Sequence, residues 1–130
     1  MSAAPAYFGD IEKCREATRW FPAMVGNHVA DIVEKYGTDR EDIPKSLTAY
    51  IEDRKGYDYS KHGQSDNAYL DFITDDIIEG FAVLGTPDDH IAKLKNLESV
   101  GVTQFNIYLD NGDEENIIAE YGKTVIPAMS

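Results

Sequence analysis

The chain has 130 residues, of which 24 are acidic and 12 basic, so its formal net charge at pH 7 is −12. Such an excess of carboxylates is repelled by phosphate backbones and anionic lipid headgroups, which argues against binding to nucleic acid or to a membrane. Hydrophobic residues make up 42% of the sequence, enough for a packed core. No repeat or linker divides the chain, so we expect one unit over residues 1–130.

Three features bear on the compartment. Cys14 is the single cysteine, so no disulfide can form within the chain and a reducing environment is expected. Residues 1–5 lack the basic and apolar regions of a secretory signal. The longest apolar stretches contain only a few residues and would not span a bilayer. The sequence therefore predicts a cytoplasmic protein.

The first part of the chain predicts one strand and a helix. The strand covers residues 3–8, and Gly9 and Asp10 after it provide a turn and a helix N-cap. A charged helix should follow over residues 10–19. Pro22 should break or kink this helix, because proline lacks the N–H donor and clashes with the preceding turn.

Two more helices are predicted before a less regular stretch. Apolar residues at helical spacing indicate a helix from Val25 to Tyr36, which Gly37 ends. Another should begin at Pro44 and end at Gly56. Residues 57–67 show neither helical nor strand periodicity.

The second part of the chain alternates strands and helices. Residues 74–76 indicate the start of a short helix. A strand over residues 81–84, a helix over 87–100 and a strand over 103–109 form a strand–helix–strand unit, in which the two strands should be parallel. A last helix should run from residue 113 to about residue 122.

Few strands and open edges predict self-association. Parallel sheets need both faces covered, and open strand edges invite pairing with another chain. The apolar pair Trp20 and Phe21 adds surface that a larger fold would bury. We therefore expect the chain to form a homo-oligomer rather than a stable monomer.

Five stretches of the sequence carry a family likeness. They are residues 19–31 (RWFPAMVGNHVAD), 57–63 (YDYSKHG), 83–87 (VLGTP), 101–109 (GVTQFNIYL) and 121–122 (YG). Together they resemble the C-terminal portion of luciferase-like monooxygenases, and most closely the branch that uses a deazaflavin cofactor.

The resemblance implies an α/β fold, namely the C-terminal part of a (β/α)8 TIM barrel that binds flavin mononucleotide (FMN) or its deazaflavin analogue. Such a barrel needs about 250 residues, so about three parallel strands with their helices would be present here, incomplete on their own. Most cofactor contacts of the family would then precede Met1. The resemblance therefore implies an oxidoreductase or monooxygenase whose partial chain is inactive alone.

The resemblance also suggests a substrate wall, formed by Tyr57, Tyr59, His62 and Tyr108. Tyr108 belongs to a strand in which polar and apolar residues alternate, so in a barrel its side chain would face the interior. Without a barrel, the strand is an ordinary half-solvated one. The stretch around Tyr57 can likewise be a surface loop that packs its tyrosines. No residue is assigned a catalytic role.

Two other types of site are disfavoured. The turn before residue 87 resembles a phosphate-binding helix N-terminus, but Thr86 and Asp89 have the spacing of a capping box, and the acidic residues would repel a dianion. The three histidines, His28, His62 and His90, show no metal-ligand spacing, so no metal site is expected.

Two functions remain open at this point. The first is a flavin- or deazaflavin-dependent oxidoreductase acting on a small-molecule substrate, as the resemblance implies. The second is a non-catalytic α/β module that associates with itself or with a partner and binds no cofactor. The small number of strands and their open edges support the second.

Overall fold

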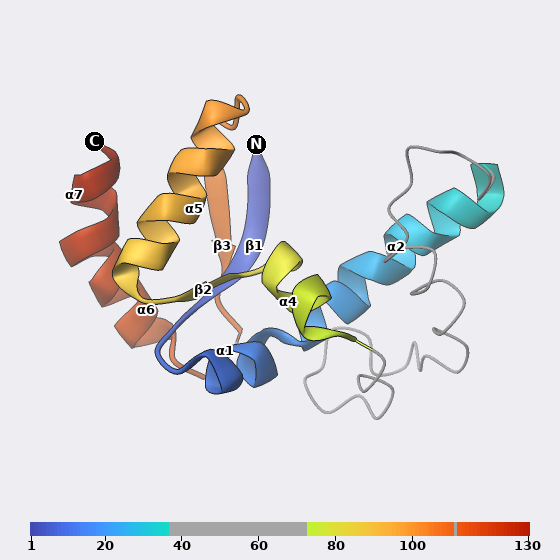
Figure 1. Cartoon of the computed structure of the whole chain (residues 1–130), viewed down its shortest axis with the longest axis horizontal. Coiled ribbons are helices and arrows are strands. Elements are labelled where there is room, and N and C mark those ends of the chain that lie inside the picture. Colours follow the sequence, from blue (N-terminus) through green and yellow to red (C-terminus); the bar gives the residue numbers. More distant parts are fainter. Residues whose placement is uncertain (37–72, 111) are drawn as a thin grey trace.

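A computed structural model describes residues 1–36, 73–110 and 112–130 (Figure 1). The predicted helix from Pro44 to Gly56 and the stretch of residues 57–67 lie outside these ranges. The elements, in chain order, are β1 (Ser2–Phe8), α1 (Ile11–Thr18), α2 (Trp20–Tyr36), α4 (Asp75–Phe81), β2 (Val83–Gly85), α5 (Pro87–Ser99), β3 (Phe105–Tyr108), α6 (Glu114–Glu120), the π-helix η3 (Tyr121–Val125) and α7 (Ile126–Met129).

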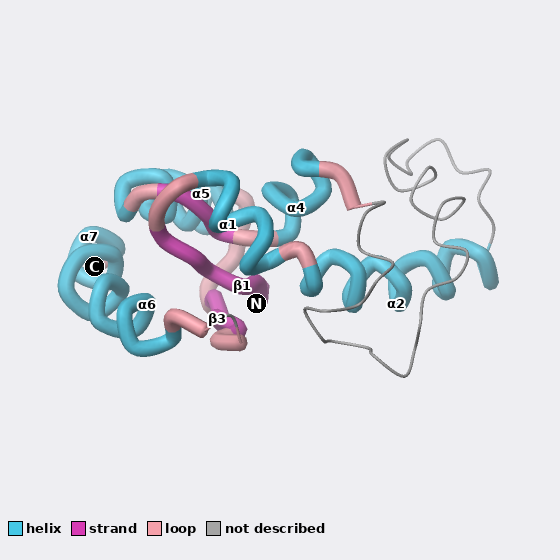
Figure 2. The backbone as a smooth tube through the Cα atoms, turned by 90° about the horizontal axis from the view of Figure 1, so that it is seen from below, coloured by secondary structure: helices cyan, strands magenta, loops and turns pink. Residues whose placement is uncertain are grey.

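The described strands form one parallel sheet in the order β2-β1-β3. The second half of β1, Ala6–Phe8, pairs with β2, and its first half, Ser2–Pro5, pairs with β3. Figure 2 shows β1 and β3 side by side. The strands of the predicted strand–helix–strand unit are parallel, as predicted, but β1 lies between them. This α/β architecture of three parallel strands with helices is compatible with part of a (β/α)8 barrel.

One core cluster lies between the sheet and the C-terminal helices. Ala6 from β1, Leu94 from α5 and Ile117 from α6 are buried there. Tyr121 and Val125 of η3 complete the cluster, which explains why the helical path continues past Gly122, where we predicted its end. The π-turn is closed by the Ile126 N–H, which donates to the carbonyl of Tyr121.

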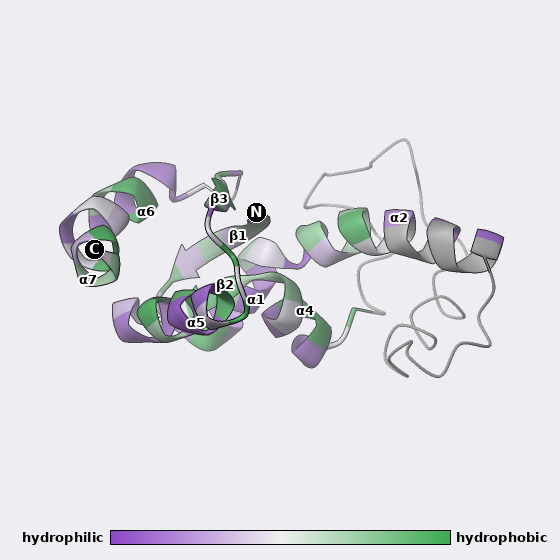
Figure 3. Cartoon of the chain, turned by 90° about the horizontal axis from the view of Figure 1, so that it is seen from above, coloured by the Kyte–Doolittle hydropathy of each residue, from purple (hydrophilic) through white to green (hydrophobic). Residues whose placement is uncertain are grey.

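A second cluster lies where α2 and α4 meet. Trp20 and Phe21 are 4% and 3% exposed and pack with Ile73 and Ile78. Figure 3 shows the corresponding hydrophobic positions in the first turns of α2 and in α4. The apolar pair that we expected to need a larger fold is therefore buried within the chain's own core.

The helix break near Pro22 is real but falls earlier than predicted. α1 begins after Asp10, whose carboxylate accepts hydrogen bonds from the N–H groups of Glu12 and Lys13. α1 ends at Thr18, and Pro22 lies in the first turn of α2. N–H groups in a first turn have no partner within the helix, so proline is tolerated there.

The strand predicted over residues 81–84 is shifted. Phe81 is the last residue of α4, and β2 covers Val83–Gly85. Phe81 continues the apolar face of α4 toward the Trp20 cluster. The ammonium group of Lys93 donates to the carbonyls of Glu79 and Ala82, which stabilises the end of α4. β3 is also shorter than predicted and covers residues 105–108 only.

Candidate functional site

Of the residues predicted to bind substrate, Tyr57, Tyr59 and His62 lie outside the described residues. Tyr108 is the last residue of β3 and pairs with Pro5 of β1. Its side chain is 45% exposed, and its ring centroid lies 5.1 Å from that of Phe21. Tyr108 therefore offers an aromatic surface on the face of the sheet opposite the C-terminal helices.

The predicted alternation along β3 is confirmed. Phe105 and Ile107 pack in the helix-side cluster. Gln104 and Asn106 are exposed, and the Gln104 amide donates to Asn106 Oδ1 at 3.0 Å, which places both on the face of Tyr108. The role of Tyr108 in binding a substrate stays a prediction.

Tyr108 borders a cavity of ≈ 440 Å³ together with Phe21 and Val25 of α2. This volume lies within the range of small-molecule sites, about 300–1,000 Å³. Ser2 and Ala3 also line it, so the cavity is beside the amino end of β1. Parallel α/β folds usually place their sites at the opposite, carboxyl ends of the strands.

A second cavity, of ≈ 500 Å³, lies at the carboxyl ends of β1 and β2. Gly9 after β1 and Thr86 after β2 line it, together with Asp89 and Lys93 of α5. Its position is the one that the fold favours for a functional site. The structure does not bring Tyr108 to this cavity.

The N-terminus of α5 at this edge is occupied by its own side chains. Asp89 Oδ2 accepts hydrogen bonds from the Thr86 N–H at 2.8 Å and the Thr86 hydroxyl at 2.7 Å. The Asp89 N–H donates in return to the Thr86 hydroxyl, which completes the predicted capping box. The hydrogen bonds from Thr86 lower the pKa of the Asp89 carboxyl below its usual value.

Neither helix N-terminus at this edge fits a phosphate. The carboxylate of Asp10 holds the first N–H groups of α1, just as Asp89 occupies α5. A phosphate would meet a negative charge at both positions, in place of the free N–H groups that bind anions. The described edge therefore does not fit the phosphate of an FMN or deazaflavin nucleotide.

The nearby cations are also engaged within the chain. The Arg15 guanidinium donates to Glu79 Oε1, with its Nε at 2.9 Å, and to Glu12 Oε1 at 2.6 Å. Asp75 lies 3.5 Å from the same guanidinium. Lys93 donates to the backbone carbonyls at the end of α4, and its burial lowers its pKa. Arg15 and Lys93 therefore connect α1, α4 and α5, and their donors are already used by groups of the chain itself.

A buried histidine beneath the end of β1 was not predicted. His90 is fully buried, and its ring stacks on Phe8 with centroids 4.0 Å apart. Nε2 lies 3.1 Å from the Tyr7 carbonyl, which can only accept, so Nε2 carries the proton and Nδ1 accepts from the Tyr121 hydroxyl at 3.0 Å. Burial lowers the pKa of His90 to about 4 and raises that of Tyr121.

A sequence signal for this burial did exist. His90 stands four residues before Leu94 and seven before Leu97, so it continues the apolar stripe of α5.

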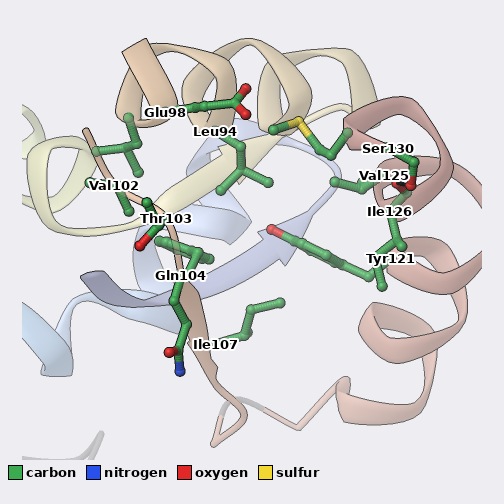
Figure 4. A pocket seen from close by; sticks show the side chains of 13 residues that line it. Leu94, Glu98, Val102, Thr103, Gln104, Ile107, Tyr121, Val125, Ile126 and Ser130 are labelled. Carbon is green, nitrogen blue, oxygen red and sulfur yellow. Dashed lines mark hydrogen bonds between the residues drawn. The ribbon is translucent and has the colours of Figure 1, made fainter. Parts of the chain in front are cut away.

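A third cavity, of ≈ 620 Å³, lies between α5, β3 and the C-terminal helices (Figure 4). It is lined mainly by apolar side chains, with Tyr121 on one wall.

Within residues 1–36, 73–110 and 112–130, no group of three or more His, Cys, Asp or Glu side chains could hold a metal ion. Cys14 is fully buried with its Sγ 3.5 Å from the Tyr7 carbonyl, and burial raises the pKa of its thiol. The thiolate form is therefore disfavoured. None of the helices in the same ranges is long and apolar enough to cross a membrane.

Three parallel strands with their helices define an α/β protein, the fold class of part of a barrel, with β1 lying between β2 and β3. The family model of luciferase-like monooxygenases matches residues 3–104. The chain therefore belongs to the luciferase-like monooxygenase family, which confirms the family resemblance.

Two relatives share most of this chain. The 5,10-methylenetetrahydromethanopterin reductase of Methanopyrus kandleri is 30% identical over 121 residues, which cover 91% of this chain and 31% of the relative. The protein of the same name from Archaeoglobus fulgidus is 28% identical over 122 residues, which cover 92% and 35%. The chain thus spans about a third of the length of these relatives. No solved structure matches it significantly.

Proposed function

We propose that the chain contributes to a flavin- or deazaflavin-dependent oxidoreductase of the luciferase-like family, acting on a small-molecule substrate in the cytoplasm. The family match over residues 3–104 carries this proposal. The two relatives are named as reductases, which supports redox chemistry. When bound, such a cofactor supplies the electron or hydride transfer, and the protein positions the substrate against it.

Within this function, we assign a substrate wall to Tyr57, Tyr59, His62 and Tyr108. Support for Tyr108 comes from its exposed aromatic ring beside a cavity of ≈ 440 Å³. Aromatic side chains combine a large apolar surface with one polar group, which suits the orientation of a small organic substrate.

The phosphate of the cofactor would need donors other than the described N-termini of α1 and α5. Both are held by carboxylates of the chain itself.

The carboxylates that hold the N-termini of α1 and α5 also favour a second candidate function, a non-catalytic α/β module that binds no cofactor. In this reading the open strand edges serve self-association or a partner protein. We propose homo-oligomer formation under either function, and sedimentation at micromolar concentration tests it. A single 14.5 kDa species would contradict it.

A titration separates the two functions. The purified 130-residue chain is mixed with FMN and, separately, with a deazaflavin, while cofactor absorbance and fluorescence are followed. A saturable change in absorbance or fluorescence supports the oxidoreductase function. A protein that is colourless as purified and that changes neither the absorbance nor the fluorescence of either cofactor supports the non-catalytic module. In neither case do we expect turnover by this chain alone, because barrel sites take their groups from the ends of several strands. Saturable turnover would contradict that expectation.

A further inference from the structure

The cavity of ≈ 620 Å³ between α5, β3 and the C-terminal helices has the features of a small-molecule site. Such sites measure about 300–1,000 Å³ and combine an apolar lining with a few polar groups that orient the ligand. Leu94 and Phe105 contribute apolar walls, and Thr103 and Gln104 line the cavity beside the amino end of β3. Tyr108 does not line this cavity, which is therefore distinct from the site assigned to Tyr108.

A π-turn shapes one wall of the cavity. It covers residues 121–125 and is closed by the Ile126 N–H, which donates to the carbonyl of Tyr121. The wall that contains this turn lines the cavity with Tyr121, Val125, Ile126 and Met129. Single π-turns inserted into helical segments occur frequently at functional sites. The turn is thus a second observation, independent of the volume, that points to a ligand here.

The Tyr121 hydroxyl is a polar group that the protein holds in a fixed direction at this cavity. Its proton is donated to His90 Nδ1 at 3.0 Å, because Nε2 carries the ring proton and donates to the Tyr7 carbonyl. The hydroxyl oxygen keeps its lone pairs, so toward a ligand it can only accept a hydrogen bond. Burial raises the pKa of Tyr121, which keeps the hydroxyl protonated. Figure 4 shows this hydroxyl directed toward Leu94 on the facing wall.

The charges around the cavity disfavour an anionic ligand. Glu98 of α5 is exposed and lines the cavity. Among the described residues that line it, none is basic. An anion would therefore lose its water without gaining a cation or a donor from Tyr121, which is costly. A neutral ligand avoids this cost.

We infer that this cavity binds a neutral, mainly apolar small molecule, such as an aromatic or aliphatic alcohol, whose hydroxyl donates a hydrogen bond to the Tyr121 oxygen. The apolar body of the ligand packs against Leu94, Phe105 and Met129. Hydrogen bonds in a chain polarise one another, so the ligand strengthens the bond from Tyr121 to His90. The inference goes beyond the proposed function and does not depend on any cofactor.

Three probes of similar size test this inference on the 130-residue chain. The probe para-ethylphenol has one hydroxyl donor, its isomer para-methylanisole has none, and para-methylbenzoate is anionic. Isothermal titration calorimetry should show saturable binding of para-ethylphenol, binding about tenfold weaker for para-methylanisole, and no binding of para-methylbenzoate. At equal saturation, the NMR signals of the His90 ring nitrogens should move further with para-ethylphenol than with para-methylanisole.

Two substitutions locate the ligand. Met129→Trp fills the cavity and should abolish binding of para-ethylphenol. Ala128→Trp, at an exposed neighbour that does not line the cavity, is the matched control and should leave binding unchanged. Tyr121→Phe keeps the ring and removes the acceptor, so it should weaken para-ethylphenol about tenfold and leave para-methylanisole unchanged. Circular dichroism checks that each variant is folded.

Three results would overturn the inference. Absence of saturable para-ethylphenol binding by the original chain would show that the cavity does not take this class of ligand. Equal affinities for para-ethylphenol and para-methylanisole would show that the Tyr121 oxygen accepts nothing from the ligand. Unchanged binding by a folded Met129→Trp variant would place the ligand elsewhere. None of these results involves a flavin or deazaflavin, so the proposed function is tested separately.

Discussion

The two faces of the sheet differ in how completely their side chains are buried and their buried polar atoms hydrogen-bonded. Toward the C-terminal helices, Ile117 is fully buried and both ring nitrogens of His90 have hydrogen-bond partners. On the opposite face Tyr108 is 45% exposed beside a cavity, and Trp20 Nε1 in the adjoining cluster is the buried side-chain polar atom without a partner in the described part of the chain. We call the first face finished because the ring nitrogens of its buried histidine are paired, although the cavity of ≈ 620 Å³ lies on that side too. We call the second face unfinished because a buried donor there has no partner and an aromatic side chain is left half-exposed.

The largest effect should come from the core of the finished face. Ile117→Ala removes a side chain that is fully buried among β1, α5 and η3, and we expect a loss of about 3 kcal/mol in the free energy of unfolding. The neighbouring Ile118 is 59% exposed, so Ile118→Ala should cost less than about 0.5 kcal/mol. Urea unfolding of both variants checks the contrast. Equal losses would mean that α6 does not dock by the Ile117 face.

His90 makes the stability of the same face depend on pH. Its pKa falls from the ordinary 6.5 to about 4 on folding because burial disfavours the charged ring. Between these values the unfolded chain binds more protons, so stability is complete above pH 6.5 and is lost as the pH falls toward 4. The full loss is about 3 kcal/mol.

His90→Gln is the control for this effect, since the amide can donate to the Tyr7 carbonyl and accept from Tyr121 without titrating. The difference in unfolding free energy between the original chain and the variant should shrink as the pH falls from 7 to 4. Carboxylates titrate in both proteins and cancel. A constant difference across this range would place His90 in contact with water.

Turn glycines should show the next largest effects. Gly85 has φ +107°, and an added Cβ would lie 2.6 Å from Asp89 Oδ2 in the capping box. Gly85→Ala therefore combines backbone strain with a clash and should cost about 2 kcal/mol or more. Gly101 has φ +96° but open space, so Gly101→Ala should cost about 1 kcal/mol. Unchanged melting temperatures for both would contradict the turn assignments.

Features of this fold that depend on neighbouring residues were predicted from local patterns in the sequence. The capping box at Thr86 and the strand alternation around Tyr108 depend on neighbouring residues alone, and both are confirmed. The predicted strand start at residue 81 and the predicted helix end near residue 122 were wrong, because tertiary packing of Phe81 and Val125 prolongs the preceding helical segments beyond their local signals. The strand order and the surroundings of His90 depend on long-range contacts, which no local spacing encodes.

The smallest expected effect on stability belongs to Tyr108 and decides how its role can be tested. Tyr108→Phe keeps the ring that lies 5.1 Å from Phe21 and removes only the hydroxyl of a half-exposed side chain. We expect the free energy of unfolding to change by less than about 0.5 kcal/mol. A larger loss, measured by urea unfolding, would show that the hydroxyl supports the fold. If stability is unchanged, weaker ligand binding by this variant shows that the Tyr108 hydroxyl contacts the ligand on the unfinished face. The substitution leaves Ile117 and His90 on the finished face unchanged.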